Sequence, residues 1–556
     1  MAQPTEPAAS PDELVGPLER GLTVLRAIAA GPETRHRPGD LARTTGLARS
    51  TVDRVATTLV RLGFLRAEGR DLLLAPRSAE LGNAYLAAAK LAEALGPHAV
   101  ALADELDESV SVAVPDGDGV RFVAQATRRR AMAISFRTGD LLPAERCAPG
   151  ALFAADWDEA EWERWRSRRR EDPLDHGFPA VPPRAGGEEA ESGLLARLGR
   201  AREDGWAVDD QLIEPGLLAV ALPVHDAAGA VVCAVSVVSH TSRHDTASLL
   251  ALALPPLRTA VVAMERALAA PAPPPDDVAP SVIRGNAGVG ALKEELGAGF
   301  LQSLARGLDV LCAFGAVRGP VRLTELARLA GLPRATARRA LITLRHLGYV
   351  REDAGDFQLL PRVLELGHAR LSGLSLAEIA GPHLSELVGR VHESASVAVL
   401  DGSDIRYVAR VASSRIMHID ITVGTRLPAY ATSMGRVLLA ALAEEERAPI
   451  LAGVTPEAFT SRTVVAPEAL AETVAETARR GYGWVEQELE EGLRSLAVPV
   501  TDGRGRVVAA VNVALHAGRC PAEQSLAALL PHLAETAARI SADLTAVGRW
   551  SPVPPA

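Results

Sequence analysis

The length, composition and charge of the chain limit what kind of protein it can be. Its 556 residues are several times the usual domain length, which predicts about four domains. Hydrophobic residues make up 48% of the chain and charged residues 23%, as in ordinary globular proteins. The net charge of -10 excludes a protein that coats nucleic acid through bulk positive charge, so any DNA contact must use a local basic surface.

The cysteines and the N-terminus bear on the compartment. The 4 cysteines lie far apart, without the close spacing of a zinc knuckle or a CxxC redox site. This pattern favours a reduced cytosolic compartment and predicts no metal or other cofactor. The N-terminus is polar and rich in proline, and the chain has neither a signal-peptide core nor an unbroken apolar run of about 18 residues. We therefore expect a cytoplasmic protein that does not associate with membranes.

An internal repeat with an offset of about 285 residues organises the sequence. GLTVLRAIAAGP from Gly21 matches GLDVLCAFGAVRGP from Gly307, and ESVSVAVPDGDGVRFVAQ from Glu108 matches ESASVAVLDGSDIRYVAR from Glu393. The order and the spacing of the matching segments are kept. The period exceeds the roughly 20 to 50 residues of solenoid repeats, so the chain is a duplicated multi-domain unit.

Each copy changes character partway along. The first part is helical with a turn, and the later part alternates short β-branched runs with helical segments rich in alanine and leucine. This pattern predicts an α+β protein in which an all-α headpiece precedes an α/β or α+β body. The expected boundaries are 14–78 for the first headpiece, 79–270 for the first body, 271–298 for a Pro-rich linker, 299–362 for the second headpiece and 363–548 for the second body.

The first headpiece has the pattern of a helix-turn-helix. A short helix containing Leu41 precedes a glycine turn at Gly46, and a second helix covers residues 49–61. Asp53 lies on this second helix; a carboxylate can accept a hydrogen bond from cytosine but repels phosphates. The candidate DNA contacts are Arg49, Ser50, Thr51 and Arg54.

The first body contains an extra segment, and a spacer follows the body. Residues 157–190 are about nine residues longer than their counterpart in the second copy, and their prolines, glycines and mixed charges lack a core pattern. We expect a surface loop in which the RSRRR run, residues 166–170, is solvated. The prolines of PAPPPDDVAP, residues 271–280, cannot join a helix interior and favour an extended spacer.

The second headpiece repeats the pattern more clearly. TELARLA predicts a short helix, Gly331 supplies the turn, and a second helix begins at Pro333. At about 100° per residue its apolar side chains fall on one side. The outward side offers Arg334, Ala335, Thr336, Arg338 and Arg339 as candidate DNA contacts. VREDAGDFQLLP then predicts a strand, an acidic turn and a strand, as in a wing.

Two other interpretations of the headpieces stay open. The helices could be an amphipathic pair with a solvated arginine face, or both headpieces could bind protein instead of DNA. Local charge favours DNA, because residues 332–350 contain four arginines and no acidic residue. Since Asp53 stands where the second copy has Arg338, we expect the two headpieces to differ in affinity or sequence preference.

Six segments of the second copy together resemble the IclR family of bacterial transcription regulators, in its protocatechuate and β-ketoadipate pathway branch. They are QSLARGLDVL, ELARLAGLPRATARRAL, LPRVLELGHARL, ESASVAVLDGSDIRYVARV, VGTRLPAYATSMGRVLLA and LEEGLRSLAVPV. They cover nearly the whole second copy, whereas the first copy matches more loosely.

The resemblance implies a fold and a function for each copy. It implies a winged helix-turn-helix, a linking helix around Leu364 to Leu371, and a GAF/PAS-like effector-binding domain with an antiparallel sheet. Family members are homodimers or tetramers that repress or activate catabolic operons in response to small organic acids. We therefore expect a double-stranded DNA operator and an aromatic or dicarboxylic acid effector as partners, and leave a contact with RNA polymerase open. Since a tandem pair is not the usual form, the chain is expected to be a pseudo-dimer or a homo-oligomer.

The effector site implied by the resemblance lies where three segments of the second copy converge. AYATSMGR offers hydroxyls and a backbone amide at an expected helix start, which suits a carboxylate. An asparagine interrupts the apolar strand VVAAVNVALH, and its amide needs a partner. The serine and threonine could instead cap the helix, and the asparagine could bond to a neighbouring strand. The candidates are Thr432, Ser433, Met434, Gly435, Glu486, Arg494, Ser495 and Asn512.

The first copy has lost much of this polarity. CAPG replaces TSMG, Leu218 and Ala219 replace Arg494 and Ser495, and Ser236 replaces Asn512. We expect the first body to bind a different ligand or none. A catalytic role is disfavoured, because the sequence contains no nucleophile elbow, metal-ligand cluster, P-loop or dinucleotide fingerprint.

Overall fold

The computed structural model describes residues 14–31, 33–128, 136–184, 190–270, 285–413, 421–550 and 553–555. The chain forms two compact units, residues 1–372 and 373–556. The first unit holds both headpieces and the first body, and the second unit holds the second body. The units do not follow the repeat, because the two headpieces pack against each other within the first unit.

Each headpiece is a small helical domain with a β-hairpin, as the sequence predicts. In the first, the elements are α1 (Gly16–Ala30), α2 (Pro38–Thr45), α3 (Arg49–Leu62), β1 (Leu65–Glu68) and β2 (Asp71–Leu74). In the second, they are α10 (Gly285–Leu296), α11 (Gln302–Ala313), β9 (Val321–Arg322), α12 (Leu323–Leu329), α13 (Arg334–His346), β10 (Val350–Asp353) and β11 (Asp356–Leu359). Helix α10 occupies the C-terminal part of the predicted linker, whereas the predicted spacer 271–280 lies outside the described residues.

The two headpieces contact each other through equivalent residues. The Val15 amide donates to the Thr343 hydroxyl at 2.8 Å, and the Leu301 amide donates to the Thr58 hydroxyl at 3.1 Å. Each bond joins the start of one headpiece to the second helix of the other helix-turn-helix. The pair of bonds is reciprocal, as at a two-fold interface.

Glycines allow helices α1 and α11 to cross closely at this interface. A Cβ added at Gly21 would lie 2.3 Å from the Leu304 side chain, and one added at Gly307 would lie 2.5 Å from the Leu18 side chain. These two contacts are again related by the repeat. The headpieces of one chain therefore pack as a dimer of like domains would.

The segments that follow the hairpins differ between the copies. In the first copy, α4 (Ala79–Ala89) is unbroken and ends at Lys90, whose φ of 63° separates it from α5 (Leu91–Leu106). In the second, the linking helix expected over Leu364 to Leu371 is broken, because Gly367 adopts φ 121° between the 3-10 turn η6 (Pro361–Leu366) and the short helix α14 (His368–Leu371). Both pieces pack against α4.

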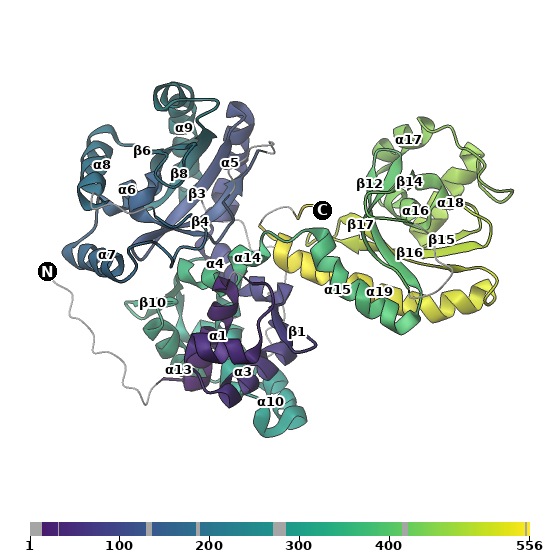
Figure 1. Ribbon diagram of the computed structural model, residues 1–556, viewed down its shortest axis with the longest axis horizontal. Helices are drawn as coiled ribbons and strands as arrows, with labels where there is room; N and C mark the ends of the chain where they lie inside the picture. The colour runs from purple at the N-terminus through teal and green to yellow at the C-terminus, as the bar shows by residue number, and fades with distance from the viewer. Residues whose placement is uncertain are drawn as a thin grey trace. The chain divides into compact units, whose positions relative to one another are not determined.

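The first body is a six-stranded antiparallel sheet covered on both faces (Figure 1). Helices α5 and α9 cover one face, and α6, α7 and α8 lie toward the other. The strand order is β5-β4-β3-β8-β7-β6. Its further elements are β3 (Ser109–Asp116), β4 (Gly119–Ala126), β5 (Leu141–Pro143), α6 (Ala148–Ala154), α7 (Glu159–Glu171), α8 (Ala190–Asp204), β6 (Ala207–Asp210), β7 (Leu217–His225), β8 (Val231–His240) and α9 (Thr246–Ala269).

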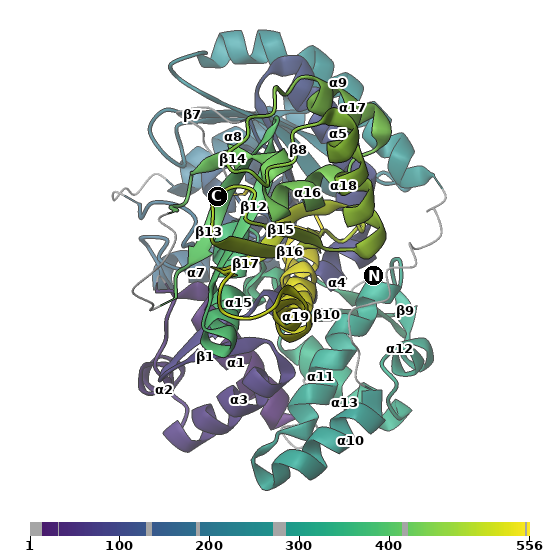
Figure 2. The same cartoon turned by 90° about the vertical axis from the view of Figure 1, so that its right-hand side faces the viewer.

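The second body repeats this architecture with the order β14-β13-β12-β17-β16-β15. Helices α15 and α19 cover one face of the sheet, and α16 packs on the other together with α18 (Figure 2). Its elements are α15 (Leu376–Val391), β12 (Ser394–Asp401), β13 (Asp404–Val411), β14 (Arg426–Pro428), α16 (Ser433–Ala440), α17 (Glu444–Ala452), α18 (Pro467–Arg480), β15 (Gly483–Glu486), β16 (Leu493–Thr501), β17 (Val507–His516) and α19 (Ala522–Gly548).

One helix among the described residues, α9, is long and apolar enough to cross a membrane by length and composition alone. It packs against β7 and α5, and it buries Leu249, Ala253 and Leu257 in that contact. Its counterpart α19 covers the same face of the second sheet. These contacts identify α9 as the covering helix of the first body.

Candidate functional site

The N-terminal halves of α3 and α13 present the candidate DNA contacts. Each helix follows a glycine in the left-handed region, Gly46 at φ 70° and Gly331 at φ 63°. The opposite side of each helix is anchored in its headpiece by buried apolar residues. Arg49, Ser50, Arg54, Arg334, Ala335, Arg338 and Arg339 are exposed, and Thr51 and Thr336 are half-buried.

The two helix starts carry different charge patterns. In α3, the Arg49 guanidinium lies 3.3 Å from the Asp53 carboxylate, one turn along the helix. In α13, Arg334 and Arg338 occupy the corresponding places, and neither has a carboxylate partner among the residues that the structure describes. The start of α13 is therefore uniformly basic, whereas that of α3 is mixed.

The second body contains a cavity between the sheet and the start of α16. The empty space among its lining residues totals about 430 Å³ when all space between atoms and the part open to solvent are counted. It lies on the face of the sheet that α16 covers, and its wall mixes apolar and polar side chains. The lining residues are Tyr407, Arg410, Ile421, Ala431, Thr432, Ser433, Met434, Val485, Leu489, Leu493, Ser495, Asn512 and Ala514.

A chain of polar groups crosses the floor of this cavity. The Asn512 amide nitrogen donates to the Ser495 hydroxyl at 3.2 Å, and the Ser433 and Ser495 hydroxyls lie 2.5 Å apart. The Asn512 carbonyl oxygen is buried without a hydrogen-bond partner. A buried oxygen without a donor costs free energy, so a donor on a bound molecule would stabilise this side chain.

Arg410 is a cavity residue that the sequence analysis missed. It lies on β13 beside Ser396 of β12, and its guanidinium reaches the Ser396 hydroxyl at 3.4 Å. Ser396 in turn pairs with Asn512 of β17. Directly paired residues share a face, so these pairings, which sequence spacing does not reveal, bring Arg410 to the cavity.

Thr432 and Gly435 have a structural role at the start of α16 instead of the expected role in binding a carboxylate. The Gly435 amide donates to the Thr432 hydroxyl at 3.1 Å, which caps α16. A Cβ at position 435 would lie 2.2 Å from the Ala429 carbonyl oxygen. This corrects the expectation that the amide is available to a carboxylate: Gly435 permits close packing, and the capping alternative for Thr432 is the one found.

Arg494 and Glu486 lie outside the cavity, which corrects the expectation that they bind the effector. The Arg494 guanidinium forms two bonds of 2.7 Å to the Glu486 carboxylate and a bond of 2.9 Å to the Ser525 hydroxyl of α19. Adjacent strand residues point to opposite faces. Because Ser495 faces the cavity, Arg494 faces α19.

A second missed pair of residues fixes the wall of the cavity. Arg436 of α16 donates to both oxygens of Glu488, at 2.7 and 2.5 Å, and to the Tyr430 carbonyl at 2.9 Å. Both ionic side chains are buried. The bidentate pair ties α16 to the turn after β15, which carries the lining residue Leu489.

The same face of the first body is filled differently. Phe122 and Phe136 stack with ring centroids 4.9 Å apart. Cys147 stands at the place of Thr432, and Gln125 at the place of Arg410. Gln125 binds Ser111 at 2.7 Å across the strands. The first body thus lacks the arginine and the hydroxyls that line the second cavity.

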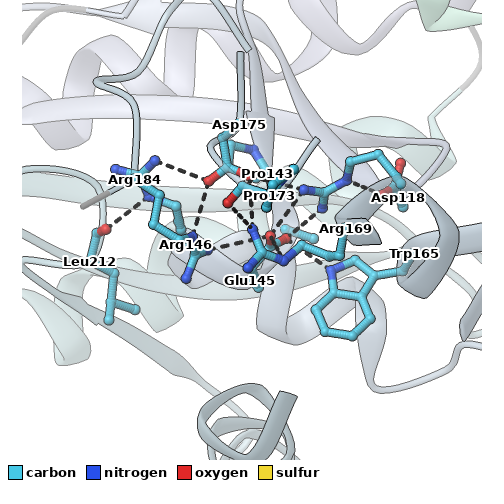
Figure 3. Close-up of polar contacts among 12 residues, drawn as sticks. Asp118, Pro143, Glu145, Arg146, Trp165, Arg169, Pro173, Asp175, Arg184 and Leu212 are labelled. Atoms are coloured by element: carbon cyan, nitrogen blue, oxygen red, sulfur yellow. Dashed lines mark hydrogen bonds and ion pairs between the residues drawn. The ribbon is translucent and has the colours of Figure 1, made fainter. Parts of the chain in front are cut away.

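The RSRRR run, expected to be solvated, takes part in a buried charge cluster (Figure 3). Segment 157–190 contains helix α7 instead of only a loop, and its Trp165 is in the core. Glu145 accepts from Trp165 at 3.0 Å and from Arg168 at 2.8 Å. Arg170 is exposed and Arg166 half-buried, each paired with a glutamate, but Arg168 and Arg169 turn inward.

Asp175 is the second anion of this charge cluster. It pairs with Arg146 at 3.2 Å, with Arg168 at 3.0 Å and with Arg184 at 3.3 Å. The carboxylate side chains of Asp175 and Glu145 are fully buried. Burial opposes ionisation, but the hydrogen bonds and charge of Arg168 outweigh it and hold the pKa of Glu145 below its usual value. The sequence missed the cluster because its carboxylates lie outside the arginine run.

The described ranges contain no group of three or more metal-ligating side chains. All four cysteines are thiols that form no disulfide, and Cys147, Cys233 and Cys312 are buried. Burial raises the pKa of the Cys233 thiol to about 12. A buried thiol with a raised pKa is a poor nucleophile.

Comparisons with known proteins match both copies to one family. The model described as the bacterial transcriptional regulator IclR C-terminal domain matches residues 83–266 and 368–542. The IclR helix-turn-helix domain matches residues 17–69 and 303–354.

Similar proteins are bacterial regulators about half as long as this chain. The Pca regulon regulatory protein of Pseudomonas putida is 44% identical over 235 residues, which cover 42% of this chain and 81% of that protein. The p-hydroxybenzoate hydroxylase transcriptional activator of Acinetobacter baylyi is 32% identical over 243 residues, 43% of this chain and 90% of that protein. A solved transcriptional regulator from Rhodococcus sp. RHA1 is 50% identical, with a TM-score of 0.42, over 45% of this chain and 100% of that chain. The chain therefore belongs to the IclR family of bacterial transcriptional regulators and carries the family's two domains in duplicate.

Proposed function

We propose that an organic acid bound in the cavity of the second body controls how this regulator binds its operator. The observation that carries the proposal is the combination of Arg410 with the unpaired oxygen of Asn512 in one cavity. A guanidinium binds a carboxylate through charge-assisted hydrogen bonds. The Asn512 oxygen would accept from a hydroxyl elsewhere on the ligand.

The remaining wall suggests the shape of the acid. Tyr407, Ile421, Val485, Leu489 and Leu493 supply an apolar surface that suits a ring or a short methylene chain. Relatives of this chain include an activator named for p-hydroxybenzoate hydroxylase and a homologue solved with 4-hydroxybenzoate. We propose a hydroxylated aromatic acid as the effector, with a dicarboxylic acid as the second candidate.

The proposal moves the anion contact from Arg494 to Arg410. Arg494 already has Glu486 and Ser525 as partners on the other face of the sheet. Ser433, Met434, Ser495 and Asn512 remain proposed effector contacts, whereas Thr432 lines the cavity as the cap of α16 and Gly435 supports that helix. The first body is proposed to bind no acid and to serve as a structural partner.

We further propose that one chain supplies both DNA-reading heads. The reciprocal bonds at Thr343 and Thr58 join the headpieces as an intramolecular pair, so Arg49, Ser50, Thr51 and Arg54 would face one half-site. Arg334, Ala335, Thr336, Arg338 and Arg339 would face the other. The role is binding and not catalysis, and it is exercised in the cytoplasm, where the operator lies. A contact with RNA polymerase stays a prediction.

Calorimetry on the full chain with 4-hydroxybenzoate, and separately with adipate, tests the effector site. We expect one binding event per chain. Arg410→Gln, which installs the residue of the first copy, should remove about 1.5–3 kcal/mol of binding free energy, or roughly 10- to 150-fold in affinity. The matched control is Arg406→Gln, which removes the same charge from the same strand, where Arg406 pairs with Asp401 at 3.5 Å.

Release of operator DNA by the acid is the functional readout. Fluorescence anisotropy of a labelled operator should change with the acid for the parent chain and the control, but not for Arg410→Gln. Equal acid binding by Arg410→Gln and the parent would contradict the proposed site.

A further inference from the structure

We propose that the two headpieces read unlike half-sites of one operator, and that Asp53 is the residue that makes them unlike. The proposal rests on the proposed function, in which one chain supplies both heads. It goes further by assigning α13 to a strongly bound half-site and α3 to a weaker half-site of different sequence.

The headpiece interface fixes both reading helices in equivalent positions. Thr58 belongs to α3 and Thr343 to α13, and each accepts from the backbone that enters the opposite headpiece. The close contacts Gly21 to Leu304 and Gly307 to Leu18 follow the same symmetry. A difference in DNA reading therefore comes from the side chains and not from how the helices are held.

The side chains differ most at one exposed position. Asp53 in α3 stands where α13 has Arg338, and both side chains are exposed on the outer face of their helices. The carboxylate of Asp53 repels phosphates and can accept from the amino group of cytosine, whereas an arginine binds guanine or phosphate. With Asp53 in place of an arginine, the helix loses an attractive contact with DNA and gains a repulsive one, unless a cytosine of the half-site lies opposite Asp53.

Asp53 also changes its neighbour. Nε of Arg49 donates to the Asp53 carboxylate at 3.3 Å, so part of the charge of Arg49 is compensated before it meets DNA. Arg334 has no such partner among the described residues. At the start of α3, Asp53 therefore partly neutralises Arg49, whereas the start of α13 carries three arginines and no carboxylate.

The simpler interpretation is that Asp53 only stabilises α3. An exposed ion pair four residues apart contributes about 0.3–0.5 kcal/mol to a helix, and it would leave the DNA sequence preference unchanged. The two interpretations can be distinguished by measuring half-site preference and helix stability on the same variants.

Selection of randomised duplexes by the full chain, without acid, tests the proposal. We expect a bipartite site with two different halves and one chain per site, as measured by native mass spectrometry. Three duplexes then follow: the selected composite, a palindrome of the stronger half and a palindrome of the weaker half. The parent chain should bind the composite best.

Asp53→Arg should shift this preference. It should bind the palindrome of the stronger half about tenfold more tightly than the parent does. The slope of the logarithm of the binding constant against the logarithm of the salt concentration should become steeper by about one. Asp53→Asn, which keeps the size of the side chain, should give a smaller shift. Glu445→Arg is the matched control, because it makes the same charge change at an exposed position in the second body, and it should leave the preference unchanged.

The contrary outcomes are distinct. A palindromic selected site, or no change of preference in Asp53→Arg despite a parent-like melting temperature, overturns the proposal. If two chains bind one bipartite site, the proposal that a single chain supplies both DNA-reading headpieces is wrong. A selected composite site that no acid affects would overturn only the proposed effector control and leave the reading of unlike half-sites standing.

Discussion

The two bodies of this chain share one architecture and treat the same place in opposite ways. Both have six antiparallel strands in the same order. The second leaves a cavity beside α16, lined by Arg410 and Asn512, whereas the first stacks Phe122 on Phe136 and adds a buried charge cluster nearby. The comparison shows that the same strand order forms with two different sets of side chains on the face that α6 or α16 covers.

The largest expected effect comes from breaking the charge cluster of the first body. Glu145→Ala would leave Arg168, Arg169 and Arg184 with one fewer carboxylate, so that only Asp175 and, for Arg168, Asp118 would compensate them. Removing one member of a buried ion network costs about 3–5 kcal/mol. Calorimetric melting should show a destabilised first unit and an unchanged second unit.

Glu203→Ala is the control for this variant, because Glu203 is exposed at the end of α8 and its loss should change little. If Glu145→Ala melts as the parent does, the cluster does not stabilise the first body. The first body would then gain no stability from the charge cluster that distinguishes it from the second body.

A smaller effect is expected at Asp209, which stands at the place of the cavity residue Val485. Burial raises the pKa of Asp209 to about 7, above the ordinary value of 3.8. The folded state therefore holds a proton that the unfolded state releases, and the stability from this group is lost as pH rises from 4 through 7. Asp209→Asn should remove that loss.

Urea unfolding between pH 5 and pH 8 measures the difference. The variant should gain stability relative to the parent as the pH rises, whereas Asp204→Asn, at an exposed position, should follow the parent at every pH. A difference that does not change with pH would show that Asp209 is already ionised in the folded protein.

The smallest expected effect comes from changing the first body toward the second. Gln125→Arg restores to the first body the arginine of the second, but the Phe122–Phe136 stack and Cys147 remain. Calorimetry with 4-hydroxybenzoate in an Arg410→Gln background should show no regained binding. Regained binding would mean that one arginine separates a sensing body from a structural one.

Much of the architecture follows from patterns along the chain, and most of the errors come from contacts between segments that are distant in the sequence. The repeat, the helix-turn-helix and the wing are local, and both family models match where the repeat predicts. The cavity depends on strand register, which brings Arg410 beside Ser396 and turns Arg494 away from Ser495. The arginines of α7 likewise looked solvated because their partner Glu145 lies more than twenty residues earlier in the chain.

The threonine bonds between the headpieces have a consequence for how this regulator can evolve. In a homodimer one gene encodes both reading helices, so every mutation reaches both half-sites at once. Here Thr58 and Thr343 join two headpieces that are encoded by different parts of one gene. Each head can accumulate substitutions alone, no exchange of subunits can mix old and new versions, and the operator is free to drift away from symmetry one base pair at a time.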